Sequence, residues 1–274
     1  SYLELREWLE HEGKCTVQTA NFCMKSVICN LCAIRRSAKL CKAYEEKILE
    51  VMSTPKHANL HPVMITLTVR NESDCRERFL HLKHSFQKLA KKANNWKQRK
   101  VKANEPPEFA HVKGGVYSYE VKRGRGGKWH PHIHVFALLE NWIDCESLSR
   151  EWEEVTGDSK IVDVRQCRGG VPEGLIEVLK YTTKFSDMEP ADVLTVEETV
   201  RGATLCSPLG ILRGVKPEAV DHDEQLDGAF VDYVAHFLYR RNGYKLKRKG
   251  DVHEDCQAEG EKRISEENES RRRD

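Results

Sequence analysis

The spacing of apolar residues predicts the first three regular elements of the chain. From Ala33 to Met52 apolar side chains recur every three or four residues, which predicts an amphipathic helix. In His61–Arg70 every second residue is apolar, as in a half-buried strand. Ser73 and Asp74 offer N-caps for a long helix that reaches about Trp96.

A hairpin and three further elements follow. Gly114–Lys122 and His130–Glu140 have the pattern of two strands, joined by the glycine-rich turn RGRGGK. A helix over Cys145–Val155, a strand over Lys160–Cys167 and a helix over Pro172–Phe185 come next. With one hairpin at its centre, this order predicts an α+β fold, in which helices cover a central, mostly antiparallel sheet.

Beyond residue 187 the pattern is weaker. Apolar residues at helical spacing in Gln225–Tyr239 predict a C-terminal helical extension, and the mixed-charge end of the chain has the composition of a disordered tail. We therefore expect four parts: a cysteine-rich segment with a helix (1–55), a central α+β domain (56–190), the helical extension (191–240) and the tail (241–274).

Composition and charge are those of a globular protein. The 274 residues are enough for one sizeable core, and 39% hydrophobic with 32% charged residues excludes a fibrous or fully disordered chain. No apolar stretch is long enough to span a bilayer, and the start SYLELREWLE lacks the layout of a signal peptide. We expect a cytoplasmic protein without a membrane partner.

Ten cysteines in a chain without an export signal are expected to stay reduced. Four of them lie near the start, at Cys15, Cys23, Cys29 and Cys32, and the last two form a CNLC pair. Thiolates two residues apart can bind one tetrahedral ion, so this segment predicts a structural zinc knuckle. The alternatives are four reduced thiols, or a site in which Cys41 replaces one ligand.

The segment WHPHIHVF carries three histidines at every second position. On a strand, His130, His132 and His134 share one face while Ile133 and Val135 point into the core. Two imidazoles on one face can bind a divalent cation and leave positions open for a phosphate, whose phosphorus becomes a better electrophile. The competing interpretation is a surface strand with histidines by chance.

A third ligand is needed to hold such a cation. Glu120, on the other strand of the predicted hairpin, has a carboxylate suited to Mg²⁺ or Mn²⁺. His130 is the alternative third ligand, or it orients the phosphate. Glu120 is otherwise an ordinary surface residue.

The segment IEVLKYTTKF places a carboxylate, a phenol and an ammonium on one helix face. Glu177, Tyr181 and Lys184 follow i, i+4, i+7 spacing. A phenol with an ordinary pKa near 10 is a poor nucleophile until a nearby cation such as Lys184 favours the phenolate. By itself, the pattern is also that of an amphipathic helix lying on a sheet.

Together these segments resemble the HUH endonucleases, and in particular the replication initiators (Rep proteins) of rolling-circle plasmids with one catalytic tyrosine. WHPHIHVF and EVLKYTTK resemble the metal and tyrosine motifs, and MITLTVRN is similar to the first motif of the family. The CNLC pair resembles its cysteine cluster, except that Asn30 stands where proline is common. The resemblance covers about Cys15–Asp187.

This resemblance implies a specific nickase reaction for the central domain. His132 and His134, with Glu120, would hold Mg²⁺ or Mn²⁺. Tyr181 would cut one strand of single-stranded or supercoiled origin DNA, keep a 5′-phosphotyrosine link and free a 3′-hydroxyl. A host polymerase and helicase would then act as partners. Glu177 resembles a general base that activates water for the terminating cleavage.

Basic residues predict the surface that contacts DNA. Between His81 and Lys102 there is no acidic residue, and the turn after the first hairpin strand adds two arginines. A lysine-rich face can also be merely solvated. The residues expected to contact DNA are Lys88, Lys91, Lys92, Lys97, Arg99, Lys100, Arg123 and Arg125.

Two other classes share parts of this pattern. A relaxase or a transposase of the HUH type could use the same motifs, but such relaxases usually place the tyrosine before the histidines, whereas Tyr181 follows them. The pair of Glu177 and Tyr181 also favours an initiator. A non-catalytic, zinc-containing DNA-binding regulator remains the alternative from a different functional class.

Overall fold

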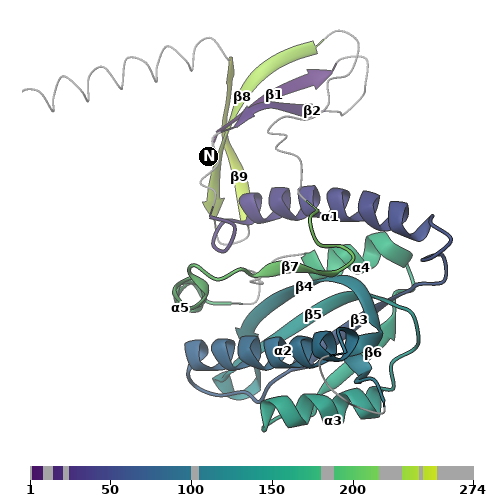
Figure 1. Ribbon diagram of the computed structural model, residues 1–274. Helices are drawn as coiled ribbons and strands as arrows, with labels where there is room; N and C mark the ends of the chain where they lie inside the picture. The colour runs from purple at the N-terminus through teal and green to yellow at the C-terminus, as the bar shows by residue number, and fades with distance from the viewer. Residues whose placement is uncertain are drawn as a thin grey trace, which may run out of the picture. The chain divides into compact units, whose positions relative to one another are not determined.

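The computed structural model describes residues 2–8, 15–20, 25–99, 105–179, 188–215, 230–240 and 243–251. By their contacts these residues form two compact units (Figure 1). One unit combines Ser1–Met24 with Ala219–Asp274, and the other is Lys25–Glu218. Within the described residues, no helix has both the length and the apolar character that crossing a bilayer requires.

The larger unit contains a five-stranded sheet in which all neighbouring strands run antiparallel. The α+β expectation is therefore confirmed, and the short edge strand β7 is an addition to the predicted sheet. In sheet order the strands are β6 (Val162–Gln166), β3 (His61–Thr68), β5 (Trp129–Leu139), β4 (Val112–Arg123) and β7 (Cys206–Gly210).

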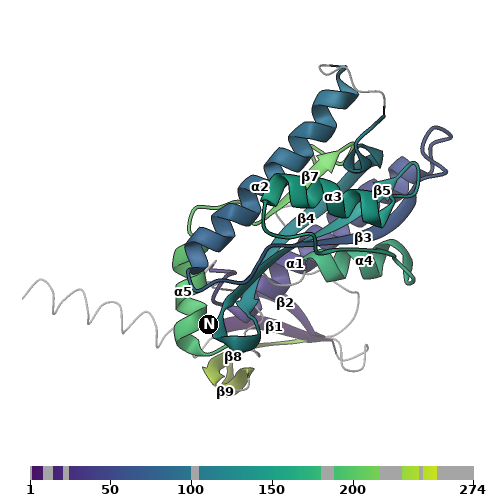
Figure 2. The same cartoon turned by 90° about the horizontal axis from the view of Figure 1, so that it is seen from below.

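Helices lie on both faces of this sheet (Figures 1 and 2). They confirm the helices expected before residue 180, although the end of the predicted Pro172–Phe185 helix lies outside the described residues. The helices are α1 (Asn30–Met52), α2 (Cys75–Lys97), α3 (Cys145–Thr156), α4 (Gly170–Leu179) and α5 (Pro190–Val200), with short 3-10 turns η1 (Glu108–His111) and η2 (Arg125–Gly127).

The face covered by α2, α3 and α5 carries the larger apolar core. Ile133 and Val135 of β5 are fully buried there, as their alternation with the histidines predicted. The start of α2 is fixed by its N-cap, because the carboxylate of Asp74 accepts a hydrogen bond of 2.9 Å from the backbone N–H of Glu77.

The opposite face is covered by α1 and α4. Ile48 of α1 and Leu175 of α4 are fully buried against Phe136 of β5. Met64 of β3 is buried here too, so this strand is covered on both sides and not half-buried as its pattern suggested. Gly174 allows the close approach of α4, because a Cβ there would lie 2.6 Å from the ring of Phe136.

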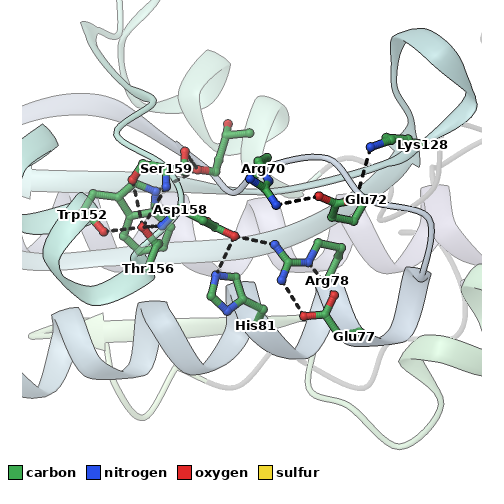
Figure 3. Close-up of polar contacts among 11 residues, drawn as sticks. Arg70, Glu72, Glu77, Arg78, His81, Lys128, Trp152, Thr156, Asp158 and Ser159 are labelled. Carbon is green, nitrogen blue, oxygen red and sulfur yellow. Dashed lines mark hydrogen bonds and ion pairs between the residues drawn. The ribbon is translucent and has the colours of Figure 1, made fainter.

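Polar bonds hold the end of β3 against α3 and the loop after it (Figure 3). The indole N–H of Trp152 and the hydroxyl of Ser159 both donate to the carbonyl of Thr68, at 2.8 and 2.6 Å. The hydroxyl of Thr156 accepts from the backbone N–H of Ser159 at 3.2 Å. Thr68 pairs with His132 in the sheet, so this network also fixes the strand beside the histidines.

A partly buried ion pair joins α2 to the same loop. The guanidinium of Arg78 lies 2.5 Å from the carboxylate of Asp158, and His81 lies 3.3 Å from that carboxylate (Figure 3). Burial raises the pKa of Asp158, but the hydrogen bond from Arg78 and the charge of His81 outweigh burial, so the pKa lies below its ordinary value.

We expect Asp158→Asn to lower the free energy of unfolding by about 2 kcal/mol at neutral pH, because it leaves a buried guanidinium without this partner. Since the pKa of Asp158 is lowered on folding, this contribution is complete above about pH 4 and is lost as the pH falls through the folded pKa. Urea unfolding at pH 7 and at acidic pH measures both effects. The control is Asp163→Asn, because the exposed ion pair of Asp163 with Arg165 contributes less than about 0.5 kcal/mol to stability. Equal losses of unfolding free energy in the two variants would contradict the stabilising role of Asp158.

The smaller unit is a four-stranded antiparallel sheet of order β2-β1-β8-β9. The helix expected over Gln225–Tyr239 is wrong, because Phe230–Arg240 form a strand, and the expected disordered tail contains another strand. The bounds are β1 (Tyr2–Trp8), β2 (Cys15–Ala20), β8 (Phe230–Arg240) and β9 (Gly243–Asp251).

Candidate metal centre

Three potential metal ligands come together on the face of the sheet that α1 and α4 cover. Glu120 of β4 pairs directly with His132 of β5, and two residues along β5 His134 pairs with Ser118. Because side chains alternate across a strand, Glu120, His132 and His134 project from the same face. Among the described residues, these three form the group whose ligand atoms lie within 4.8 Å of one another.

The donor atoms of this group point at each other. The Nε2 atoms of His132 and His134 lie 3.3 and 3.4 Å from the same carboxylate oxygen of Glu120. The two imidazole rings are nearly perpendicular, with centroids 4.7 Å apart. Two nitrogens and one oxygen that converge in this way can form one side of a coordination sphere.

The bond made by the second ring nitrogen orients His134. The hydroxyl of Thr66, its partner on β3, lies 3.1 Å from its Nδ1. A partner at Nδ1 holds the ring so that Nε2 faces the carboxylate. The Nδ1 of His132 is buried and has no hydrogen-bond partner among the described residues, so this ring is held by packing and by Glu120.

Burial sets the protonation of the centre. The side chains of Glu120 and His132 are both about 5% exposed. Desolvation lowers the pKa of His132 below its ordinary value, although the hydrogen bond to Glu120 opposes this shift. At neutral pH the ring is therefore uncharged and has a lone pair available for a cation.

The donor set fits a divalent cation. A buried carboxylate is costly unless a positive charge lies beside it, and the uncharged ring of His132 does not supply one. A mixed set of two imidazole nitrogens and one carboxylate oxygen suits first-row divalent ions such as Mn²⁺, and the carboxylate also suits Mg²⁺. Glu120, His132 and His134 are thus the residues that would hold the ion.

His130 lies beside this centre but outside the three-residue group. Its Nδ1 is 2.6 Å from the side-chain oxygen of Asn71, and its ring centroid is 5.3 Å from that of His132. Burial and the neighbouring His132 and Lys122 lower its pKa to about 4, so the ring is neutral at pH 7. Of the two roles considered for His130, this geometry favours contact with a phosphate over metal ligation.

The helix α4 runs along the sheet toward Glu120, His132 and His134. Gly174 lies against Phe136, and one turn later the carbonyl of Val178 accepts a hydrogen bond from the hydroxyl of Ser118, the partner of His134. The carbonyl of Leu179 accepts from Ser37 of α1. These two bonds fix the point from which the chain continues to Tyr181. Tyr181 and Lys184 themselves lie outside the described residues.

Glu177 is described and has a partner on the sheet. Its carboxylate accepts a hydrogen bond of 2.7 Å from the guanidinium of Arg165 on β6. The carboxylate is about one-third exposed. This bond holds Glu177 toward the β6 edge, with access to solvent.

The basic residues expected to contact DNA differ in their surroundings. The ammonium of Lys92 pairs with Glu154 at 2.6 Å, and that of Lys97 donates to the carbonyl of Val112. Arg123 bonds to Asp192 at 2.7 Å and lies 3.8 Å over the ring of Trp129. The exposed residues of the predicted set on or just after α2 are Lys88, Lys91, Lys97 and Arg99, whereas Lys100 and the side chain of Arg125 lie outside the description.

The expected zinc ligands are described only in part. Cys29 caps the start of α1, and Cys32 lies in its first turn; both thiols are buried. Cys23 and the side chain of Cys15 lie outside the described residues. The zinc knuckle therefore stays a prediction.

Four supporting residues were not found from the sequence: Thr66, Ser118, Asn71 and Arg165. Each acts through a partner on another strand or helix. The one available signal was the polar residue at every second position of ITLT, which places Thr66 on the face opposite to the apolar residues.

Comparison with known proteins places the chain in a family. The sequence model of the family described as Replication protein matches residues 14–233, well over half of the chain. A curated relative from Lentilactobacillus hilgardii, named Protein rep, is 24% identical over 276 residues, which cover 88% of this chain and 83% of the relative. No solved structure matches the chain. The chain therefore belongs to the replication protein family.

Proposed function

We propose that the protein is a rolling-circle plasmid replication initiator that nicks one DNA strand at an origin. The observation that carries this proposal is the group of Glu120, His132 and His134, which lies beside the end of the helix that leads to Tyr181. Membership of the replication protein family supports the biological setting. The cleavage chemistry is our inference from the residues.

Chain length supports the placement of Tyr181 at the centre. The carbonyl of Val178 is bonded to Ser118, which is paired with the ligand His134. Paired residues in an antiparallel sheet lie about 5 Å apart, and three residues of chain extend at most about 10 Å. The backbone of Tyr181 therefore lies at most about 10 Å from Val178. The long side chain of Tyr181 can extend further toward the proposed ligands.

The proposed nicking step is a transesterification. The phenol oxygen of Tyr181 attacks the scissile phosphorus, the bond from phosphorus to the 3′-oxygen breaks, and a 5′-phosphotyrosine forms. The phenol gives its proton to solvent, and the departing 3′-oxygen takes one up. When bound at Glu120, His132 and His134, the cation would polarise the phosphoryl oxygens. Lys184 favours the phenolate form of the nucleophile.

The products fit the start of rolling-circle synthesis. The free 3′-hydroxyl is a primer for a host polymerase, and a host helicase opens the duplex ahead of it. Because the phosphotyrosine link keeps the energy of the phosphodiester bond, the strand can be rejoined without ATP. Exposed lysines on α2 would contact the DNA backbone, and Lys88 and Lys91 are the foremost candidates.

Glu177 would serve as the general base for the terminating cleavage. We expect Glu177→Ala to keep the first nick within about threefold of wild type and to slow the second, water-dependent cleavage by about 10²-fold, the usual contribution of a general base. The measurement supplies a second origin strand to the preformed adduct and follows release of the protein.

The matched control is Glu173→Ala, one turn earlier on the same helix, which should leave both steps unchanged. The role of Glu177 is refuted if initial nicking in Glu177→Ala falls as far as it does in Tyr181→Phe. That result would place Glu177 in the first step.

A cleavage assay tests the proposal as a whole. The protein is incubated with a single-stranded origin oligonucleotide and Mn²⁺ or EDTA, and the products are separated under denaturing conditions. We expect a shortened strand and a protein–DNA adduct with Mn²⁺, and neither with EDTA. A regulator would bind the strand without cutting it. A relaxase or transposase would also form an adduct, but it would not depend on Glu177 for a terminating cleavage.

A further inference from the structure

A hollow opens at the end of β3, beyond the metal ligands. It has a volume of about 620 Å³, within the range of small-molecule sites. Its lining includes the apolar side chains Val69 and Ile161 and the polar side chains Arg70, Asn71, Lys128 and His130. Apart from His130 and its partner Asn71, none of these residues has a role in the proposed reaction.

The walls of this hollow suit a nucleotide. Ile161 is 64% exposed although it is aliphatic, which gives a base an apolar surface. Glu72 lies between Arg70, at 2.9 Å, and Lys128, at 3.3 Å, and holds both cations at the rim (Figure 3). A planar guanidinium can stack on a base or bind a phosphate, and an ammonium can bind a phosphate.

The position of the hollow relative to the metal ligands and α4 indicates which part of the DNA it faces. Along β5 the order is His134, which faces Ser118 and the end of α4, then His132, then His130. His130 lines the hollow and is held by Asn71. The metal ligands therefore lie between the end of α4 and the hollow.

In-line displacement then decides which nucleotide faces the hollow. The attacking and leaving oxygens lie on opposite sides of the phosphorus. If Tyr181 approaches from the end of α4, the departing 3′-oxygen points the other way, past His130. The nucleotide that carries this oxygen is directed into the hollow.

We propose that this hollow binds the nucleotide on the 5′ side of the nick, the one that keeps the released 3′-hydroxyl, and that it selects the base at that position. Arg70 and Ile161 contact the base, Lys128 contacts a phosphate, and Asn71 is a positioning residue that orients His130. The inference rests on the proposed nickase function and adds a specificity site to it.

Binding in EDTA tests the hollow without cleavage. A labelled single-stranded pool of random sequence is titrated with the full chain, and fluorescence anisotropy gives the affinity. We expect Arg70→Ala and Ile161→Asp to bind about tenfold more weakly, as loss of one stacked base predicts. The controls are Leu49→Asp on α1 and Lys56→Ala on the loop after it, whose side chains are exposed. Their affinities for the pool should stay within about twofold of wild type. Wild-type affinity in both hollow variants would overturn the proposal.

Sequencing of cleavage products tests the base preference. The same pool is cut with Mn²⁺, and the 3′ ends of the released fragments are sequenced. We expect one base to dominate the last position with the wild-type protein and to lose its dominance with Arg70→Ala, while the preference on the adduct side is kept. If Arg70→Ala forms adducts with the wild-type base preference at the released 3′ end, the role of the hollow is overturned and the proposed function stands. If the wild-type protein forms no adduct, the proposed function and this inference are both overturned.

Discussion

We expect replacement of His132 with alanine to remove nearly all metal-dependent cleavage. The side chain supplies one of the two Nε2 atoms that converge on Glu120, and it is buried and uncharged, so its lone pair is available for the cation. We expect the affinity for Mn²⁺ to fall by at least about 100-fold. Loss of several kcal/mol of charge stabilisation corresponds to a cleavage rate lower by on the order of 10³-fold.

Calorimetric titration with Mn²⁺ and the oligonucleotide assay measure these two effects separately. His84→Ala, on the exposed side of α2, is the control and should change neither value. Glu120→Gln should resemble His132→Ala, because it removes the carboxylate charge and keeps the shape. A His132→Ala protein that still binds Mn²⁺ with wild-type affinity would show that the ion binds elsewhere.

Tyr181→Phe will lose covalent DNA attachment completely. Phenylalanine keeps the ring and removes the attacking oxygen, so any remaining cleavage has to come from water. We expect a rate lower by about 10⁴-fold or more, with Mn²⁺ affinity and strand binding unchanged.

Tyr117→Phe on β4 is a matched control for loss of a phenol oxygen, because Tyr117 packs with the aromatic core on the opposite face of the sheet. Its cleavage rate should stay near wild type. Adduct formation by Tyr181→Phe would transfer the nucleophilic role to another side chain.

Local patterns were sufficient to predict most of the larger unit. The alternation of His130, His132 and His134 with apolar residues placed β5 and its two faces, and Asp74 placed the start of α2. The edge strand β7 of the five-stranded sheet was not predicted. The short strand Cys206–Gly210 contains a proline and has no alternating pattern long enough to be distinctive.

The strand β8 was mistaken for a helix for a physical reason. Phe230, Val234, Phe237 and Leu238 recur at three- and four-residue spacing, as on one helix face. The same stretch is rich in β-branched and aromatic residues, which favour strands, and its partner β1 lies more than 200 residues earlier in the chain. Pairing at such a sequence distance overrides the local spacing.

That Glu120, His132 and His134 come together could be predicted because their spacing is local, whereas their supporting residues could not be predicted. His132 and His134 lie on one strand, and Glu120 lies on the other strand of the same hairpin. Thr66 and Ser118 acquire their roles only through cross-strand register and helix packing. Asn71 acts on a residue 59 positions away. Such pairs follow from the assembled sheet and not from any local pattern.

The most direct test of the central claim is to identify the residue that carries the DNA. The protein is allowed to cut a single-stranded origin oligonucleotide with Mn²⁺, the adduct is digested with protease and nuclease, and mass spectrometry locates the nucleotide-bearing peptide. We predict one modified peptide, with the 5′-phosphate on Tyr181. The central claim is that Tyr181 acts in one active site with Glu120, His132 and His134. A nucleotide on any other residue, or cleavage without a modified peptide, would contradict it.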